Sequence, residues 1–291
     1  MTIIQTGIIL FPMNNNKKYF TIGQITDLHV GRKIPFPSGE VDLYKQLVKA
    51  VDNLNSIDPP LDMAVISGDL ANHGIEEDYI RVKSQLDRLN FPYFIVMGNH
   101  DQRETLKKVF SEHTYLVTDN EFIQYTLEDK PIRIIALDTL EPGTHYGLMC
   151  EKRIEWLENK LAEQPERPTL IFMHHPPMDT GMPYPDHLGM HNKEAFAAVI
   201  NKNPQIEAIA SGHTHRDSVL RWNGTVVYVT PSSAFSYGLE FHDVDDVDPL
   251  LEPPAARIFR WDPEVGLVAH LSYIGNYEFG ITEGMPEPPK N

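Results

Sequence analysis

The sequence contains a single cysteine, Cys150, among 291 residues, and one cysteine cannot form a disulfide within the chain. A small fold held together by disulfides is therefore excluded, and a reducing compartment is the default expectation. Long apolar runs are also missing, because no stretch approaches the ~18 uncharged apolar residues of a membrane span. The run 3–11 is interrupted by Gln5, Thr6 and Gly7 and no basic residue precedes it, so we interpret it as an extension and not as a signal peptide. We expect a cytoplasmic protein with no membrane partner.

Positive charge is scarce as well. The chain has 25 Lys and Arg against 41 Asp and Glu, which gives a formal net charge of −16. Such a surface repels polyanions, so we expect no long nucleic acid as a partner. An acidic protein that binds an anionic ligand needs local positive charge, and bound divalent cations can supply it. The length suffices for one large α/β domain with a small appended cap.

Apolar runs alternate with helical patterns through most of the chain. We predict strands where short apolar runs end in polar residues, at 19–25, 63–66, 93–97, 132–137, 169–173 and 206–210. We predict helices where apolar residues recur at helical spacing, at 41–54, 79–89, 152–162 and 193–201. The Pro-rich stretch that contains Pro35, Pro37 and Gly39 is expected to be a loop. This alternation is typical of a layered α/β sandwich with helices on both sides of the sheet.

The pattern changes to β alone after residue 225. Strands are expected without intervening helices at 225–229, 257–261 and 268–273. We predict that this tail forms a second sheet layer or a cap. The acidic, Pro-containing segment 240–254 is expected to be a loop or a hairpin tip, and 283–291 a frayed end.

Five short polar clusters follow the predicted strands. They are Asp27-Leu28-His29, Gly68-Asp69, Gly98-Asn99-His100-Asp101, His174-His175-Pro176-Pro177 and Gly212-His213-Thr214-His215. In open α/β sheets, ligands bind beyond the carboxyl ends of the strands. Carboxylate, imidazole and amide donors without thiolate suit Mn²⁺, Fe, Zn²⁺ or Co²⁺, and match Ca²⁺ or Cu(I) poorly. One such cluster alone is more often a turn or a helix cap, but five in order indicate a metal site.

The spacing within the clusters predicts how the ligands are shared. Residues i and i+2 at a strand end point the same way, so Asp27 and His29 can reach one ion together. The same geometry would send His213 and His215 into one site. Two ions ~3.5–4 Å apart need a bridging anion, and a lone carboxylate such as Asp69 can provide it.

The order of these clusters resembles the signature of calcineurin-like metallophosphoesterases. Within that superfamily, the context 68–74 with Glu77 and Tyr79, and the run 172–177, resemble the bacterial glycerophosphodiesterase and class III cyclic-nucleotide phosphodiesterase branch. The resemblance runs from about residue 19 to residue 231 and implies a four-layer α-β-β-α sandwich with a small β-rich C-terminal extension or cap. The expected organisation is an N-terminal extension, a catalytic domain, and a β-rich region that completes the second sheet or forms a cap, at 1–17, 18–235 and 236–291 respectively.

The resemblance also implies a role for each cluster. It implies two divalent transition-metal ions, with Mn, Fe, Zn and Co left open. One ion would be held by Asp27, His29, Asp69 and His215. The other would be held by Asp69, Asn99, His174 and His213. His174 is chosen over His175 because the family's ligand stands two residues before a proline, here Pro176. His100 would be the catalytic residue, beside a phosphate oxygen or the leaving group.

Other polar residues are weaker candidates for contacts with the ligands or the substrate. They are His73, Asp101, Asp138 and His175. Asp101 and Asp138 could orient His100 or cap a helix. His73 could contact substrate or be a surface histidine. Several loop histidines could overhang the pocket, namely His145, His187, His191 and His242. The aromatic stretch 234–237 could frame a substrate group or pack in the core.

The function that follows from the resemblance is hydrolysis of a small phosphodiester. The substrate would be a cyclic nucleotide such as 3',5'-cAMP or a glycerophosphodiester, attacked in line by a hydroxide that bridges the two ions. The alternatives are a phosphomonoesterase or another metallophosphatase, and a binding protein that keeps the fold without turnover. Binding proteins of that kind lose ligands, whereas here every ligand and His100 are present. The β-rich tail could pair across a homodimer.

Overall fold

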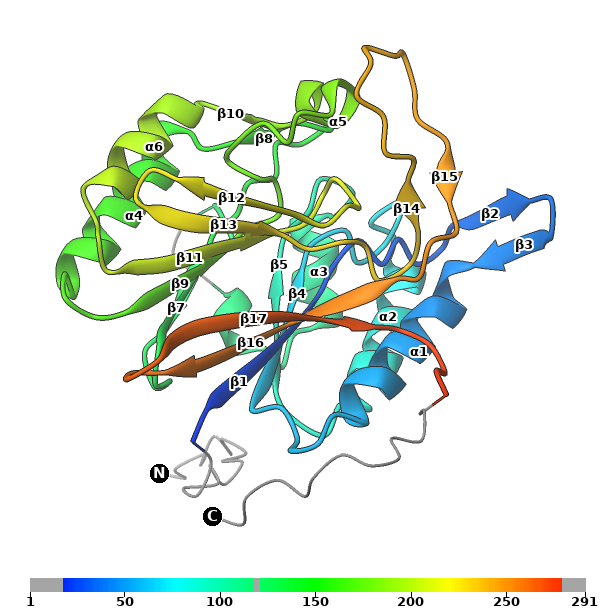
Figure 1. Cartoon of the computed structure of the whole chain (residues 1–291), viewed down its shortest axis with the longest axis horizontal. Helices are drawn as coiled ribbons and strands as arrows, with labels where there is room; N and C mark the ends of the chain where they lie inside the picture. The colour runs from blue at the N-terminus through cyan, green and yellow to red at the C-terminus, as the bar shows by residue number, and fades with distance from the viewer. Residues whose placement is uncertain (1–17, 118–120, 279–291) are drawn as a thin grey trace, which may run out of the picture.

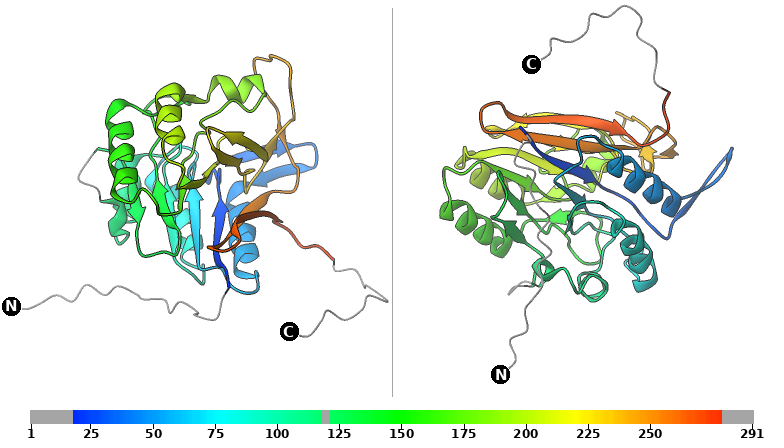
Figure 2. Two further views of the ribbon diagram at one scale, coloured as in Figure 1. Left: turned by 60° about the vertical axis from the view of Figure 1, so that its left-hand side comes forward. Right: turned by 90° about the horizontal axis from the view of Figure 1, so that it is seen from below.

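Two β-sheets pack face to face, and helices cover the outer face of each (Figure 1). The computed structural model describes residues 18–117 and 121–278. Figure 2 shows the four layers from the side, with helices of the N-terminal half on one flank and helices of the central part on the other. Side chains from both sheets, among them Ile22 and Phe172, belong to one buried core. The predicted four-layer α-β-β-α sandwich is confirmed.

The first sheet has five strands in the order β17-β16-β1-β4-β5. Their bounds are β1 (Phe20–Ile25), β4 (Met63–Ser67), β5 (Tyr93–Val96), β16 (Ala255–Asp262) and β17 (Gly266–Tyr273). β1, β4 and β5 are parallel, and β16 pairs with β1 in the antiparallel sense. The C-terminal strands therefore extend the first sheet. The expectation that they form part of the second sheet or a cap is wrong for 255–273.

The second sheet has six strands in the order β12-β13-β11-β9-β7-β6. Their bounds are β6 (Tyr125–Leu127), β7 (Arg133–Ala136), β9 (Thr169–Phe172), β11 (Ile206–Ser211), β12 (Ser218–Trp222) and β13 (Thr225–Val229). The four inner strands are parallel, and the edge strands β6 and β12 are antiparallel to their neighbours. β12 is largely exposed, so it lacks the buried apolar run that predicts a strand.

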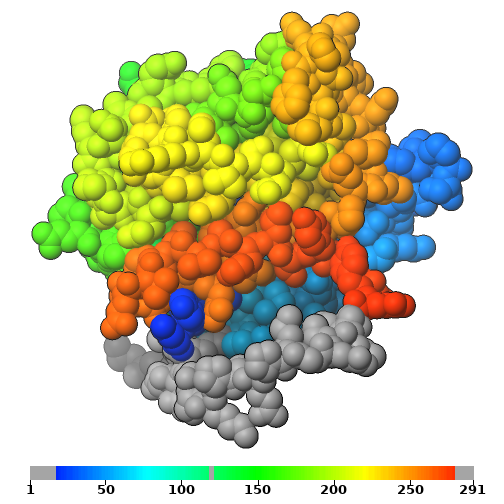
Figure 3. Space-filling view, in the orientation of Figure 1, coloured from blue at the N-terminus to red at the C-terminus, as the bar shows by residue number. Residues whose placement is uncertain are grey.

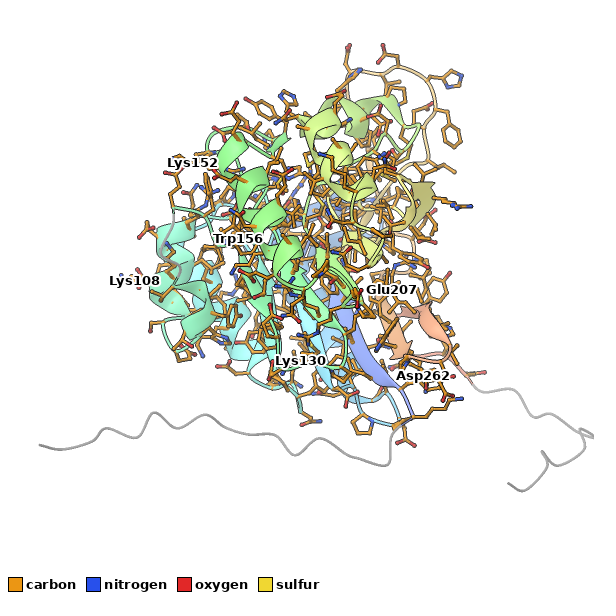
Figure 4. All side chains as sticks on the ribbon, turned by 90° about the vertical axis from the view of Figure 1, so that its left-hand side faces the viewer. Lys108, Lys130, Lys152, Trp156, Glu207 and Asp262 are labelled. Atoms are coloured by element: carbon orange, nitrogen blue, oxygen red, sulfur yellow. The ribbon has the colours of Figure 1, made fainter. Side chains whose placement is uncertain are left out.

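Helices flank the sheets much as the apolar spacing predicts. The first sheet is covered by α1 (Leu43–Asn55), α2 (Glu76–Leu86) and α3 (Arg103–Val109), and the second by α4 (Glu151–Glu163) and α6 (Lys193–Asn201). Asp42 caps α1 by accepting a hydrogen bond from the Tyr44 backbone N–H. On α4, Lys152 is exposed (Figure 4). Trp156 is partly buried against a second group of buried apolar side chains, which includes Ile171, Leu157 and Phe196 of the second sheet and its helices. A single 3₁₀ turn, η1 (Thr114–Leu116), follows α3.

Short elements outside the two sheets surround the carboxyl ends of the parallel strands. They are the hairpin β2 (Lys33–Phe36) and β3 (Gly39–Asp42), the pair β8 (Gly147–Leu148) and β10 (Met190–His191), α5 (Pro183–His187), and the pair β14 (Ser236–Tyr237) and β15 (Pro249–Leu250). The hairpin and the segment between β14 and β15 project from the body in Figure 3. The loop expected around Pro35 is thus a hairpin. Its Ile34 packs into a small core with Leu43, Ala234 and Phe235. Among the described residues, no helix is long and apolar enough to cross a membrane.

Candidate metal centre

The five polar clusters lie together beyond the carboxyl ends of β1, β4, β5, β9 and β11. Most of their acidic and imidazole side chains are buried, and Asp27, His29, Asp69, His174 and His215 are each at most 2% exposed. Burying several ionisable groups in one place is unfavourable unless they are paired or coordinate a cation. The distances between their polar atoms distinguish these two cases.

One group of atoms surrounds a point between β1 and β11. Nε2 of His29 lies 3.1 Å from Nε2 of His215 and 3.5 Å from Oδ2 of Asp69. Oδ1 of Asp27 lies 3.5 Å from the same His215 nitrogen. These four side chains are the ones that the family resemblance implies for the first ion.

A second group lies beside the first and includes one of its atoms. Nε2 of His174 lies 3.4 Å from Oδ2 of Asp69 and 3.1 Å from Oδ1 of Asn99. The same Asn99 oxygen lies 3.0 Å from Nδ1 of His213. Oδ2 of Asp69 therefore belongs to both groups, which is the position of a bridging carboxylate.

The hydrogen bonds of the histidines test whether these groups fit metal ions. Nδ1 of His174 donates to the Ser67 carbonyl at 2.8 Å, and Nδ1 of His215 donates to the Phe235 carbonyl at 3.0 Å. His213 donates through Nε2 to a backbone carbonyl at 3.0 Å. In the neutral rings of His213 and His215 the other nitrogen therefore carries a lone pair directed at the group, and His174 offers one once it has lost its second proton.

Lone pairs that face each other are repulsive unless a cation lies between them. Donor atoms ~2.0–2.2 Å from a common ion are about 3–3.5 Å apart, which is the spacing found in both groups. The side-chain amide of Asn99 donates from Nδ2 to Nδ1 of His145 at 3.3 Å, so its oxygen is turned toward His174 and His213. The donor set of carboxylate, imidazole and amide oxygen therefore fits two transition-metal ions.

The pKa values of the imidazoles agree with a ligand role. Burial lowers the pKa of His29 and of His213 to about 3, and burial also holds the pKa of His215 well below its usual range. These rings are therefore neutral at pH 7 and available to bind a cation.

The pKa values of Asp27, Asp69 and His174 depend on the charges of these three residues as well as on burial. Burial, reinforced by the neighbouring Asp69 charge, raises the pKa of Asp27 to about 7. For His174, burial alone would lower the pKa, but the Asp69 carboxylate outweighs it and raises the pKa to about 9. Burial likewise opposes ionisation of Asp69, yet His174 holds the pKa of that carboxyl well below its usual value. Without a cation, His174 is therefore the charge partner of Asp69.

The backbone at the ligands is left-handed. Five non-glycine residues of the site have positive φ: Asp27 (54°), His29 (44°), Asp69 (53°), His213 (72°) and His215 (58°). Such conformations are costly for L-residues and cluster at functional sites. In such backbone, residues i and i+2 need not point the same way, as they do in an extended strand. His213 faces Asn99 and His215 faces His29, so the expectation that this H-x-H pair would enter one site is wrong, because the chain has left the extended conformation.

Glycines next to the ligands allow the loops to approach one another. A Cβ on Gly68, which has a φ of +102°, would lie 2.4 Å from Nδ1 of His174. A Cβ on Gly212 would lie 2.1 Å from Oγ1 of Thr26 and 2.6 Å from Oδ2 of Asp27. These glycines are therefore required by close packing around the centre.

His100 lies at the edge of the centre and lines a cavity above it. Its Nδ1 donates to the Asn72 carbonyl at 2.8 Å, and its backbone N–H donates to Oδ1 of Asp69 at 2.9 Å. Its ring stands edge-on to the His29 ring with centroids 4.7 Å apart. The second ring nitrogen, Nε2, is therefore left for a ligand.

Asp101 does not orient the His100 ring as expected. Its carboxylate accepts hydrogen bonds from the Gly98 and Leu70 backbone N–H groups at 2.9 and 3.1 Å, and from the Tyr79 hydroxyl at 3.0 Å. These bonds join the loop after β5 to the loop after β4. Asp101 therefore supports the two loops that carry Asp69 and Asn99.

The other weaker candidates lie in different surroundings. Asp138 forms a two-pronged ion pair with Arg103 at 2.7 and 2.8 Å, and not a contact with His100. His73 is exposed and does not line the cavity. His175 is buried, accepts at Nδ1 from the Thr139 hydroxyl at 2.8 Å, and donates from Nε2 to the His145 carbonyl at 3.2 Å. His175 therefore supports the loop that carries His145.

The cavity above the centre has a volume of about 310 Å³. Besides ligands and His100, it is lined by side chains that include His145, Tyr184, Tyr237, Arg32, Asp246 and Asp248. Of the four loop histidines considered from the sequence, only His145 is among the lining residues. In the aromatic stretch, Phe235 is buried against the rings of His29 and His215, and Tyr237 lines the cavity.

Arg32, Tyr184 and the two aspartates were not found by sequence reasoning. Tyr184 lies on α5, and Asp246 and Asp248 lie in the acidic loop before β15. No motif marks such loop residues, and only the position of Arg32, three residues after His29, is a signal that could have been used.

This fold and this pair of adjacent donor groups define a dinuclear metallophosphoesterase. A family model described as calcineurin-like phosphoesterase matches residues 20–217, and the chain belongs to that family. A probable glycerophosphodiester phosphodiesterase GpdQ of Arcobacter nitrofigilis is 33% identical, over 88% of this chain and 93% of that protein. A probable cyclic nucleotide phosphodiesterase of Rhodopseudomonas palustris is also 33% identical, over 79% of this chain and 84% of that protein.

The fold is also found among solved structures. A dimetal phosphatase from Danio rerio superposes with a TM-score of 0.62 over 89% of this chain and all of that one, at 15% identity. At that identity the likeness concerns the fold alone. The predicted family is confirmed, and the protein is a phosphoester hydrolase.

Proposed function

We propose that the protein hydrolyses small phosphodiesters with the help of two divalent transition-metal ions. The observation that carries the proposal is the position of Oδ2 of Asp69, which lies 3.5 Å from a His29 nitrogen and 3.4 Å from a His174 nitrogen. One carboxylate oxygen placed between two complete donor groups is what a pair of adjacent ions requires. The two relatives of 33% identity are both described as phosphodiesterases, which supports the diester substrate.

The ligand assignment implied by the family resemblance is part of the proposal. The first ion is assigned to Asp27, His29, Asp69 and His215, and the second to Asp69, Asn99, His174 and His213. When bound, the ions would supply positive charge for the phosphoryl oxygens and would lower the pKa of water, so that hydroxide is available to attack phosphorus near neutral pH.

His100 has the catalytic role in this proposal. Donation from its Nδ1 to the Asn72 carbonyl fixes the ring, and Nε2 is left to hold a proton toward the leaving oxygen of the substrate. A protonated His100 also stabilises the charge that develops on the phosphoryl oxygens. Asn99 is oriented by His145, so the cavity wall beside His100 is held in place from two sides.

The charge of the cavity favours a diester over a monoester. A diester carries one negative charge at neutral pH, whereas a monoester dianion carries nearly two. Two carboxylates that are not assigned as ligands, Asp246 and Asp248, line the cavity and repel the additional charge. Glycerophosphodiesters and cyclic nucleotides both meet this condition, and we propose that either class enters the site.

Three further properties belong to the same proposal. The donor set suits Mn, Fe, Zn or Co, and Mn²⁺ is the ion we would test first because oxygen ligands are well represented. The single cysteine and the acidic surface suit a cytoplasmic enzyme, as the sequence predicts. A homodimer paired through the β-rich tail also stays a prediction.

A substrate panel tests the proposal directly. The purified protein would be stripped with a chelator, reloaded with Mn²⁺, and assayed with cyclic nucleotides, glycerophosphodiesters, an aryl diester and an aryl monoester. We expect activity only after reloading, about two ions per chain, and a higher kcat/KM for diesters. A tenfold preference for the aryl monoester would refute the diester substrate, and full activity with one ion would refute the dinuclear centre.

A matched pair of variants shows whether the activity belongs to this site. Asp69→Ala removes the shared oxygen and is expected to abolish turnover and ion binding. His73→Ala is the control, because His73 is exposed and lies outside the cavity. Activity that survives in Asp69→Ala would place the reaction elsewhere.

A further inference from the structure

Arg32 lies at the wall of the cavity, in the loop between β1 and the β2–β3 hairpin. Within the described part of the chain, it is the one Arg or Lys among the residues that line this cavity. Its neighbours along the chain are not ligands, and His29 is three residues away. The cavity therefore has one permanent positive charge that belongs to the protein itself.

The other arginines show how unusual this position is. Eight of the ten other arginines pair with a carboxylate, namely Arg81, Arg88, Arg103, Arg133, Arg153, Arg167, Arg216 and Arg257. The two that pair with none among the described residues, Arg221 and Arg260, do not line the cavity. Arg32 has no carboxylate partner among residues 18–117 and 121–278, although the chain has 41 Asp and Glu. In so acidic a protein, a guanidinium left without a carboxylate at a ligand cavity is available for an external anion.

Aromatic side chains hold Arg32 in place. Its guanidinium carbon lies 5.4 Å from the centre of the Phe235 ring, within the range of a cation–π contact. It also interacts with the Tyr237 hydroxyl. Burial raises the pKa of Tyr237, and the contact with Arg32 offsets part of that rise. Its backbone N–H donates to the His29 carbonyl at 3.1 Å. Phe235 in turn is packed with Ile34 of the hairpin.

Arg32 lines the same cavity as the donor groups. An anion that enters this cavity can therefore contact the guanidinium while it lies at the donor groups. The planar fork of donors on a guanidinium matches two phosphate oxygens.

Other residues that line the cavity are acidic. Tyr184 interacts with the carboxylate of Asp246, and Asp248 lines the cavity as well. These carboxylates repel an anion and can accept hydrogen bonds from hydroxyls. Among the described lining residues, the guanidinium of Arg32 is therefore the permanent charge that attracts a phosphate group.

From these observations we propose that Arg32 binds the phosphate group of the substrate and thereby determines which way the diester lies in the cavity. The anionic group contacts Arg32, and hydroxyls of the alcohol substituent are left to donate to the lining carboxylates Asp246 and Asp248. The inference rests on the proposed phosphodiesterase function, but it concerns a residue with no ligand role.

Binding of inorganic phosphate to the Mn²⁺-loaded protein tests the inference without turnover. We expect Arg32→Ala to weaken phosphate binding, measured by calorimetry, by about tenfold to a hundredfold, the range for a lost hydrogen bond to a charged group. Arg32→Lys should recover part of the affinity, because it keeps the charge but not the fork of donors. The KM of every diester should rise by a similar factor, with the ion content unchanged.

Arg221→Ala is the matched control, since it removes the same charge from the exposed strand β12. Phosphate affinity in Arg32→Ala equal to that of Arg221→Ala would overturn the proposal. A fall in phosphate affinity that is fully explained by a lower metal content of Arg32→Ala would overturn it as well. A change confined to one diester would also overturn it, because Arg32 would then contact the substituent. If phosphate binding depends on Arg32 but the wild type hydrolyses no diester, the proposed function is wrong, and only the anion-binding role of Arg32 stands.

Discussion

The Oδ2 atom of Asp69 lies 3.4 Å from Nε2 of His174, and the His174 ring is fixed by its hydrogen bond to the Ser67 carbonyl. Ser67 is the last residue of β4 and His174 follows β9, so this contact joins the two sheets. The same Asp69 oxygen faces His29 at 3.5 Å. The shared carboxylate is therefore positioned by strands of both sheets, and the centre forms where the sheets meet.

The shared position of Asp69 predicts different losses for two ligand variants. Asp69→Ala should abolish binding of both ions. Asn99→Ala removes a neutral oxygen from one group only. It should lower the affinity for one ion by about tenfold to a hundredfold while the other ion stays bound. Mn²⁺ titrations of each variant, followed by elemental analysis, would measure the two affinities separately. Equal losses at both sites in Asn99→Ala would show that Asn99 is not confined to one ion.

Metal affinity should rise with pH. In the metal-free protein the pKa of Asp27 is about 7, raised by burial, and that of His174 is about 9, raised by the Asp69 charge against the effect of burial. Both groups must lose a proton before they can bind a cation, so protons compete with the metal below these values. We expect the apparent Mn²⁺ affinity to increase from about pH 6 to about pH 9.

Calorimetry in buffers of different ionisation enthalpy gives the number of protons released with each ion. At pH 7 the release should exceed one proton per chain, because His174 is then protonated and Asp27 is partly so. An affinity that stays constant between pH 6 and pH 9, with no proton release, would contradict this prediction.

Close packing around the centre predicts an effect of a single methyl group. In Gly212→Ala the added Cβ would lie 2.1 Å from Thr26 and 2.6 Å from the Asp27 carboxylate, so one of them must move. We expect the metal affinity to fall by at least about tenfold, and the free energy of unfolding to fall by about 1–3 kcal/mol. Gly238→Ala is the control, because its Cβ would meet nothing within 4 Å. Equal metal affinity in the two variants would show that the loop adjusts without disturbing Asp27.

The sequence was sufficient to find the centre because its residues follow buried strands. Parallel strands end at the same edge of a sheet, so Asp27, Asp69, Asn99, His174 and His215 could be brought together in advance. The separation of His213 from His215 could not be predicted from the sequence, because strand alternation does not apply to left-handed backbone.

Long-range pairing and loop packing were beyond the local pattern. β16 pairs with β1 across most of the chain, and no periodicity specifies that partner. The hairpin around Pro35 forms because Ile34 finds a small core, which overrides the loop preference of proline. Arg32 and Tyr184 reach the cavity through such loops, so the sequence alone indicates the ions and not the residues that surround the substrate.

The last prediction concerns His100, whose Nδ1 is held by the Asn72 carbonyl and whose ring lies against His29. If Nε2 assists the leaving group, His100→Ala should keep both ions and the fold. It should then lose about 10²–10⁴-fold in kcat/KM on diesters with an alkoxide leaving group, and much less on aryl diesters, because a phenolate departs with little help.

The comparison of leaving groups separates this role from two others. A structural role for His100 would lower stability and ion content, and would slow all substrates alike. A uniform loss with both ions bound would instead assign His100 to stabilisation of the phosphoryl oxygens. His73→Ala serves as the control for loss of an imidazole, since His73 is an exposed neighbour in sequence of Asn72 and does not line the cavity. Unchanged kcat/KM on every diester would remove His100 from the mechanism, and the leaving oxygen would then have to take its proton from water.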